Sequence, residues 1–279
     1  VALRPFLAPV WRVLRDFARQ VASGAPPGTI WQKQLSKSFE WRSAFLAGHA
    51  AGVTRTYHLE SYMTHSKCLR MTVDASPWGI GGWPSLDGRP VAWFADRISD
   101  ADVRVLKIDV GSPDGQQALE CLSALASLRA WLRYWLQCCS LSLRGDNITM
   151  LSMITDFGGL SPAVNLLTCE TALLIALACY RPVGAEHAPG VANAIADALS
   201  RRFQPGTPWA LPSFLVGTPE TTLPLRDEAW YLTAGSPSAC SISALMGDVP
   251  QRWHRDCIRC AASLCAGCCI ICRLDRSCL

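Results

Sequence analysis

The chain has 279 residues, of which half are hydrophobic and 17% are charged, and its formal net charge is +4. This composition excludes a globally disordered chain, and the length is enough for one or two domains with buried cores. The most apolar stretch, residues 171–180, reaches only about half of the roughly 20 residues that a membrane span needs. The basic N-terminal residues also lack the pattern of a signal peptide, so we expect an intracellular protein that is not secreted and has no membrane partner.

Charge is unevenly distributed along the chain. Residues 1–68 hold nine Lys and Arg against three Asp and Glu, whereas residues 69–203 hold eleven against thirteen and residues 204–279 hold six of each. A basic segment before an acidic body suits an enzyme that grips a polyanion with one part and binds cations with the other. An ordinary solvated basic surface would give the same numbers, so charge alone does not decide between these interpretations.

The first region in chain order, residues 1–68, is predicted to be a basic helical segment. A helix is expected from Pro5 to Val21, and the Gly-Ala-Pro-Pro-Gly stretch at 24–28 breaks it. The sequence begins with Val1 rather than Met, which suggests a cut within a longer polypeptide.

Three short strands are predicted next, at residues 69–73, 80–83 and 91–94. The first alternates apolar and polar residues, and the turn signal Leu-Asp-Gly-Arg-Pro at 86–90 separates the second from the third. Because tight turns join them, we expect the three strands to be antiparallel neighbours.

A polar stretch at 96–115 is predicted to lead into alternating helices and strands. We expect a helix at 116–137, a strand at 140–143, two helices of which the second spans 161–180, a strand at 181–187 and a helix at 192–202. Three meandering strands followed by alternating strand and helix predict an α/β fold with one mixed five-stranded sheet, antiparallel and then parallel, flanked by helices.

Four acids stand at the ends of predicted strands or within predicted helices: Asp74, Glu120, Asp146 and Asp197. Glu120 has no Lys or Arg three or four residues away, and burying an unpaired carboxylate is costly. A divalent cation shared with other carboxylates would neutralise it, and oxygen ligands suit Mg²⁺. The alternatives are that Glu120 faces water, that Asp146 caps a helix, and that Asp197 pairs with Arg201.

Two stretches carry a resemblance to a known family. Val73–Gly82, V-D-A-S-P-W-G-I-G-G, resembles the opening of the ribonuclease H domain in reverse transcriptases of retroelements, of the LTR or DIRS-like type. His187–Arg201 is similar to the closing H-x-P-G-x-x-N-x-x-A-D-x-L-S-R signature of that family, and Glu120 and Asp146 fall between in the required order. The resemblance covers about residues 69–203, which are therefore predicted to be a ribonuclease H-like domain.

The resemblance implies a metal-dependent endonuclease that hydrolyses the RNA strand of RNA–DNA hybrids. The four acids would bind two Mg²⁺ ions, with Mn²⁺ as the alternative, and His187 would assist proton transfer or product release. Further candidates for substrate contact are Ser76, Trp78, Asn147 and Asn193. Residues 1–68 resemble the connection region of such polyproteins, and no Tyr-x-Asp-Asp polymerase motif is present, so the implied partners are the hybrid and an upstream reverse transcriptase domain.

Residues 204–279 are predicted to be a Pro-rich linker followed by a poorly ordered Cys-rich tail. Seven of the fourteen cysteines lie in the last 23 positions, including two C-x-x-C pairs at 257–260 and 265–268. Four residues separate the pairs, which is too short for a zinc ribbon and argues against zinc, although His254 could add a ligand.

Two other functions remain as alternatives to an active ribonuclease. The first is a catalytically inactive retroelement remnant that binds nucleic acid without cleaving it. The second is an integrase or transposase of the same general fold, whose last catalytic glutamate would fall near Arg181, where the chain has no acid.

Overall fold

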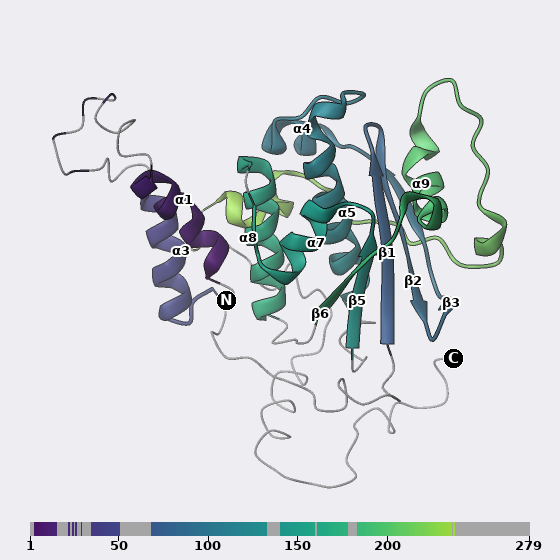
Figure 1. The fold of residues 1–279 in the computed structure, drawn as a ribbon, viewed down its shortest axis with the longest axis horizontal. Helices are drawn as coiled ribbons and strands as arrows, with labels where there is room; N and C mark the ends of the chain where they lie inside the picture. Colours follow the sequence, from purple (N-terminus) through teal and green to yellow (C-terminus); the bar gives the residue numbers. More distant parts are fainter. Residues whose placement is uncertain are drawn as a thin grey trace, which may run out of the picture. The chain divides into compact units, whose positions relative to one another are not determined.

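The computed structural model describes residues 3–15, 22, 24, 26, 29, 35–50, 68–132, 140–159, 161–177, 183–235 and 237 (Figure 1). All of them belong to one compact unit, Val1–Ser241. The Cys-rich tail, and with it the expectation about zinc, lies outside the described residues. Within the described part of the chain, no helix is both long enough and apolar enough to span a bilayer.

One mixed sheet forms the centre of this unit. Its strands are β1 (Cys68–Ser76), β2 (Gly79–Leu86), β3 (Arg89–Pro90), β4 (Phe94–Arg97), β5 (Ser140–Gly145) and β6 (Val183–His187). The order is β3-β2-β1-β5-β6, with β4 also paired to β2. Strands β1 to β4 pair antiparallel, whereas β1, β5 and β6 pair parallel. The predicted α/β class, one mixed sheet with antiparallel and then parallel strands flanked by helices, is confirmed.

The third predicted strand differs from the structure. Instead of one strand at 91–94, β3 and β4 pair with different parts of β2, and the chain between them leaves the sheet. Trp93 turns away to pair with a distant segment: its N–H donates to Pro219 O at 3.1 Å, and its carbonyl accepts from Thr221 N at 2.7 Å. The sheet therefore has six strands rather than five, with β3 and β4 sharing the place beside β2.

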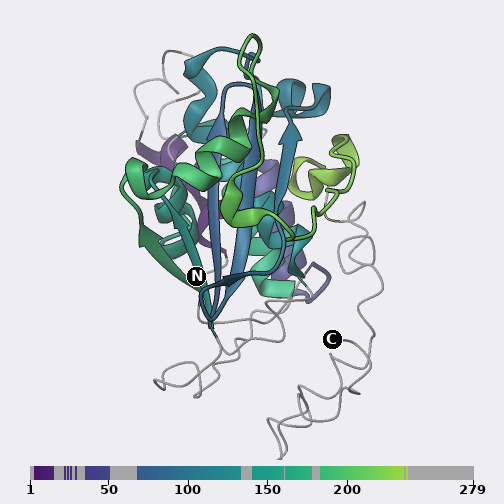
Figure 2. The ribbon, with the colours of Figure 1, turned by 90° about the vertical axis from the view of Figure 1, so that its right-hand side faces the viewer.

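Helices cover both faces of the sheet. The helices of this part of the chain are α4 (Asp100–Leu106), α5 (Gln116–Ala130), α7 (Ile148–Thr155), α8 (Pro162–Leu177) and α9 (Ala194–Ser200), and the main contacts with the strands come from α5, α7 and α9. Both α5 and α9 contact β1 and β2, and they do so from opposite faces (Figures 1 and 2). The polar stretch at 96–115, in which no helix was predicted, contains α4, which begins with a capping box: Ser99 Oγ accepts from Asp102 N, and Asp102 Oδ2 accepts from Ser99 N.

Two glycines of β2 allow α9 to approach the sheet closely. A Cβ at Gly81 would lie 2.5 Å from the Cβ of Leu199, and one at Gly79 would lie 2.9 Å from the carbonyl oxygen of Ser200. Any larger residue would push the helix away. Gly79 and Gly81, which form the G-x-G of the stretch 73–82, therefore allow the polar face of α9 to lie against β1.

Part of the predicted N-terminal helix is described as α1 (Arg4–Arg15), and a further helix, α3, spans Ser36–Leu46. The ring of Phe6 lies 5.4 Å from that of Trp41 and 5.1 Å from that of Phe45, centroid to centroid. The two helices thus share a small aromatic core.

Residues 204–235 do not form the poorly ordered linker that the sequence suggested. They pack along the domain, and Leu215, Tyr231 and Thr233 are buried. Arg226 is also buried, and its guanidinium pairs with the buried carboxylate of Asp102 at 3.0 Å. The proline-rich sequence hides these contacts because the buried side chains follow no helical or strand period.

Candidate active site

Three carboxylates meet at one edge of the sheet. Strands β1 and β5 are parallel neighbours, and Thr72 pairs with Arg144. Asp74 and Asp146 each follow two residues later, so they reach the same edge with side chains on the same face. Glu120 comes from the second turn of α5. One carboxylate oxygen of Asp74, one of Glu120 and one of Asp146 lie within 4.8 Å of one another.

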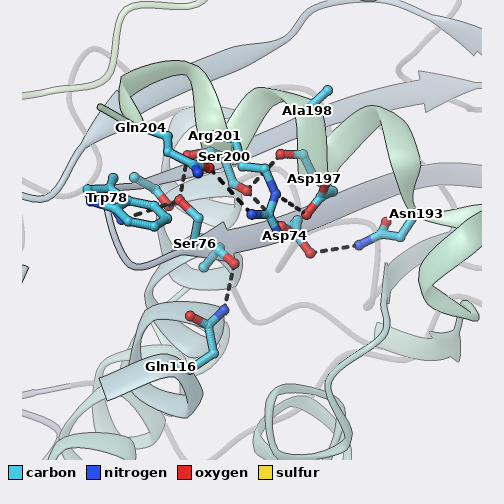
Figure 3. Close-up of polar contacts among 12 residues, drawn as sticks. Asp74, Ser76, Trp78, Gln116, Asn193, Asp197, Ala198, Ser200, Arg201 and Gln204 are labelled. Atoms are coloured by element: carbon cyan, nitrogen blue, oxygen red, sulfur yellow. Dashed lines mark hydrogen bonds and ion pairs between the residues drawn. The ribbon is translucent and has the colours of Figure 1, made fainter. Parts of the chain in front are cut away.

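Side chains of the α9 region hold Asp74 in place. It is 4% exposed, its Oδ1 accepts from Asn193 Nδ2 at 3.1 Å, and its Oδ2 lies 2.7 Å from the hydroxyl of Ser200 (Figure 3). The pKa of Asp74 is raised to about 7: burial is the largest cause, the Ser200 hydrogen bond opposes the rise, and the charges of Asp197 and Asp146 add to it.

Glu120 is buried and only partly satisfied. It is 4% exposed, and its Oε1 accepts from Gln116 Nε2 at 2.9 Å, while Gln116 also donates to Ala75 O at 2.6 Å. Among the described residues, its Oε2 is buried without a hydrogen-bond partner. Burial, and then the charge of Asp74, raise the pKa of Glu120 well above its ordinary value. The alternative that Glu120 faces water is therefore excluded.

The three acids fit a divalent cation. Mutual repulsion and burial make the charged forms of Asp74 and Glu120 costly, and Glu120 Oε2 lacks the donor that a buried carboxylate oxygen needs. Asp146 is accessible to solvent, which leaves the cluster open on one side. An all-oxygen donor set of this kind suits Mg²⁺ or Mn²⁺.

The fourth predicted ligand, Asp197, does not join the three-acid cluster. Its Oδ1 accepts from Arg201 Nε at 2.7 Å in an i,i+4 ion pair, and the two side chains are 42% and 47% exposed. The pairing that the sequence left open is therefore present. Asp197 still acts on Asp74, whose pKa it raises after the larger effect of burial.

His187 is the last residue of β6 and is exposed. It pairs in register with Gly145, the residue before Asp146, so the strand end that carries it borders the acid cluster. Asn193 instead is 1% exposed and donates to Val73 O at 3.1 Å as well as to Asp74. Its amide is therefore an internal support of Asp74.

The other predicted substrate contacts differ in exposure. Ser76 is buried, and its hydroxyl donates to Ser200 O at 2.8 Å and accepts from Trp78 N at 3.3 Å. Trp78 is half-buried in the turn between β1 and β2. Asn147 caps α7, because its Oδ1 accepts from Met150 N at 3.1 Å. The helix cap that the sequence allowed for Asp146 thus belongs to its neighbour.

Two supporting residues escaped the sequence reasoning, Gln116 and Ser200. Gln116 precedes Glu120 by four residues, and Ser200 follows Asn193 by seven, so each spacing places the pair on one helix face. The spacing indicates that the two residues of each pair share a helix face. It does not show which carboxylate that face contacts.

Comparison with known proteins gives structural matches alone, since no protein-family model and no curated protein matches the chain. Ribonuclease H1 from Halobacterium salinarum NRC-1 is 21% identical over 47% of this chain and 93% of its own, with a TM-score of 0.36. The N-terminal RNase H domain of rv2228c from Mycobacterium tuberculosis is 12% identical over 48% and 94%, with a TM-score of 0.32. The foamy viral protease-reverse transcriptase in complex with dsDNA is 12% identical over 67% and 36%, with a TM-score of 0.28.

Proposed function

We propose that this chain is a metal-dependent ribonuclease that hydrolyses the RNA strand of RNA–DNA hybrids, as part of a retrotransposon polyprotein of the LTR or DIRS-like type. The observation that carries the proposal is the cluster of Asp74, Glu120 and Asp146, with a buried Glu120 oxygen left without a donor. The family-like stretches that contain Asp74 and Asp197 support the choice of substrate.

In this proposal Asp74, Glu120 and Asp146 hold one divalent ion, and Asp197 with Asp74 holds a second. Bound Mg²⁺ or Mn²⁺ would supply charge neutralisation at the phosphodiester and activation of water. The protein's own part is to keep the carboxylates in a fixed arrangement. Asn193 and Ser200 orient the two oxygens of Asp74, and Gln116 orients Glu120.

Proton transfer is assigned to His187, whose exposed imidazole stands at the strand end beside Gly145. An imidazole can both donate and accept a proton, which suits this role. Among the four predicted substrate contacts, Trp78 is the one we retain for contact with the hybrid, because its half-exposed ring can pack against a nucleotide. The 2′-hydroxyl would distinguish the RNA strand from the DNA strand.

The wider setting is also part of the proposal. An upstream reverse transcriptase domain of the same polyprotein is the proposed partner, with residues 1–68 as the connection. The basic character of that segment supports contact with nucleic acid. Such an enzyme would work inside the cell, where reverse transcription takes place.

Cleavage of an end-labelled RNA–DNA hybrid by the full chain with Mg²⁺ or Mn²⁺ tests the proposal. We expect cleavage confined to the RNA strand, and its loss in Asp74→Asn and Glu120→Gln. Asp87→Asn is a matched control: Asp87 is an exposed acid in the β2–β3 turn with φ 49°, a conformation that Asn tolerates. Hybrid binding without cleavage by the wild type would favour the inactive remnant and overturn the enzymatic proposal.

A further inference from the structure

Helix α9 and the residue that precedes it present three polar side chains toward β1. Asn193, Asp197 and Ser200 are spaced four and three residues apart, and the outer two both bond to Asp74 (Figure 3). Asp197, between them, is therefore held near Asp74 although it stays outside the three-acid cluster. Two carboxylates fixed in this way repel each other unless a cation lies between or beside them.

Arg201 supplies that positive charge. Its Nε lies 2.7 Å from Asp197 Oδ1, and its Nη1 makes a longer contact of 3.4 Å with Gln204 Oε1. Its charge also reaches the cluster, since it opposes the rise in the pKa of Asp74 that burial and Asp197 produce. A guanidinium stays protonated at every working pH, so this charge cannot be removed by loss of a proton.

We propose that Arg201 is a positioning residue that acts as the internal counter-cation of Asp197, and that a second divalent ion must displace it to bind there. The inference rests on the proposed function, because it assumes that the acids bind metal. Arg201 would then weaken the second ion's binding while leaving the ion at Asp74, Glu120 and Asp146 little affected. The pair is about half exposed on both sides, so its own contribution is small and the exchange is open to solvent.

The neighbouring arginine offers a matched control. Arg202 pairs with Glu220 and lies over the rings of Trp93 and Trp209, at 5.7 and 4.9 Å from their centroids. Arg202 therefore carries the same charge as Arg201 and is its neighbour in the sequence, but it contacts different residues. Removing Arg202 changes the net charge as removing Arg201 does, and it leaves the Asp197 pair intact.

Calorimetric binding of Mn²⁺ to the full chain at low ionic strength, without nucleic acid, tests the inference independently of activity. For the wild type we expect a tighter and a weaker binding step. Arg201→Gln should tighten the weaker step about threefold, the scale of one exposed ion pair. Arg201→Lys, which keeps the charge, and Arg202→Gln should both bind as the wild type does. Circular dichroism would confirm that each variant is folded.

The outcomes separate the two proposals. A weaker step that is unchanged or loosened in Arg201→Gln would overturn the role of Arg201 and leave the metal site standing. A weaker step visible only in Arg201→Gln would support the inference, because the guanidinium would then block the second ion in the wild type. If the wild type binds no more Mn²⁺ than Asp74→Asn does, both the inference and the metal site fail.

Discussion

The hydroxyl of Ser200 lies 2.7 Å from Oδ2 of Asp74 and ties the last turn of α9 to β1. Residues 126 positions apart in the sequence thereby share one buried hydrogen bond. A hydrogen bond to a charged group contributes more than one between neutral groups, and its loss leaves a buried oxygen unsatisfied. The contact therefore serves both the stability of the fold and the orientation of the proposed metal ligand.

Substitution of Ser200 tests that double role. Ser200→Ala should lower the free energy of unfolding by about 1–3 kcal/mol, because Asp74 Oδ2 loses its donor in a buried site. Mn²⁺ binding should weaken as well, since one oxygen of Asp74 is then free to rotate. Urea unfolding and calorimetry on the same samples measure both effects. Unchanged stability together with unchanged Mn²⁺ affinity would contradict the role assigned to the hydroxyl.

The pH dependence of stability should reveal the buried acids in metal-free buffer. Burial raises the pKa of Asp74 from 3.8 to about 7, so the folded chain holds this proton more tightly than the unfolded chain does. The free energy of unfolding should then fall as the pH rises from about 4 to about 7, by roughly 1.4 kcal/mol for each unit of pKa difference. Glu120, whose pKa burial also raises, adds to the fall.

Asp74→Asn should flatten this pH dependence, because the neutral amide has no proton to lose. We expect the variant to match the wild type most closely near pH 4 and to be the more stable protein at pH 8 in the presence of EDTA. Urea unfolding at pH 4 and at pH 8 measures this difference. Asp87→Asn is the control, which should keep the wild-type dependence of the free energy of unfolding on pH. An Asp74→Asn slope equal to that of the wild type would show that Asp74 is not the titrating group.

Divalent cations should reverse the loss of stability at high pH. An ion bound to the folded state alone stabilises it by about 2.7 kcal/mol at one hundred times its Kd. Protons compete for the same oxygens, so the rise in Tm on adding Mn²⁺ should be larger at pH 8 than at pH 6. Thermal unfolding with and without EDTA measures it. An equal rise in Glu120→Gln would place the bound ion elsewhere.

The close approach of α9 to β2 can be tested at Gly81. Gly81→Ala puts a methyl group 2.5 Å from the Cβ of Leu199, so the helix must shift and the free energy of unfolding should drop by about 1–3 kcal/mol. Gly184→Ala on β6 is the control, because its nearest neighbour would be Leu141 O at 3.7 Å, an ordinary contact. Similar losses of stability in both variants would mean that replacing any glycine in a strand lowers the free energy of unfolding, and that the contact with α9 is not the cause.

The C-terminal segment should contribute as strongly as a core element. Arg226→Gln leaves the buried Asp102 carboxylate without its cation, and we expect a loss of about 3–5 kcal/mol. Arg104→Gln breaks the exposed pair with Glu228 and should cost less than about 1 kcal/mol. Urea unfolding compares the two directly. A small loss in Arg226→Gln would argue that residues 204–235 attach only loosely.

Sequence patterns predicted the sheet because its strands and turns are encoded locally. The alternation at 69–73 and the turn at 86–90 correspond to β1 and the β2–β3 connection. The break at Trp93 was missed because its partners, Pro219 and Thr221, lie far along the chain. Contacts of that kind leave no periodic trace in either segment.

Strand ends and motif spacing identified Asp74, Glu120 and Asp146, which the structure brings together. The sequence could not decide whether Asp197 joins them, because its ion pair with Arg201 and its proposed metal role use the same spacing. The structure shows the ion pair, and the metal role of Asp197 stays a proposal.

The ion pair between Arg226 and Asp102 also has a consequence for synthesis. Its partners are 124 residues apart, so Asp102 stays without its cation until Arg226 has left the ribosome. A chain ending between Phe203 and Arg226 would keep the acid cluster but would bury the Asp102 carboxylate without its cation. Folding of the nascent domain is therefore completed only after the proline-rich segment that carries Arg226 has been translated.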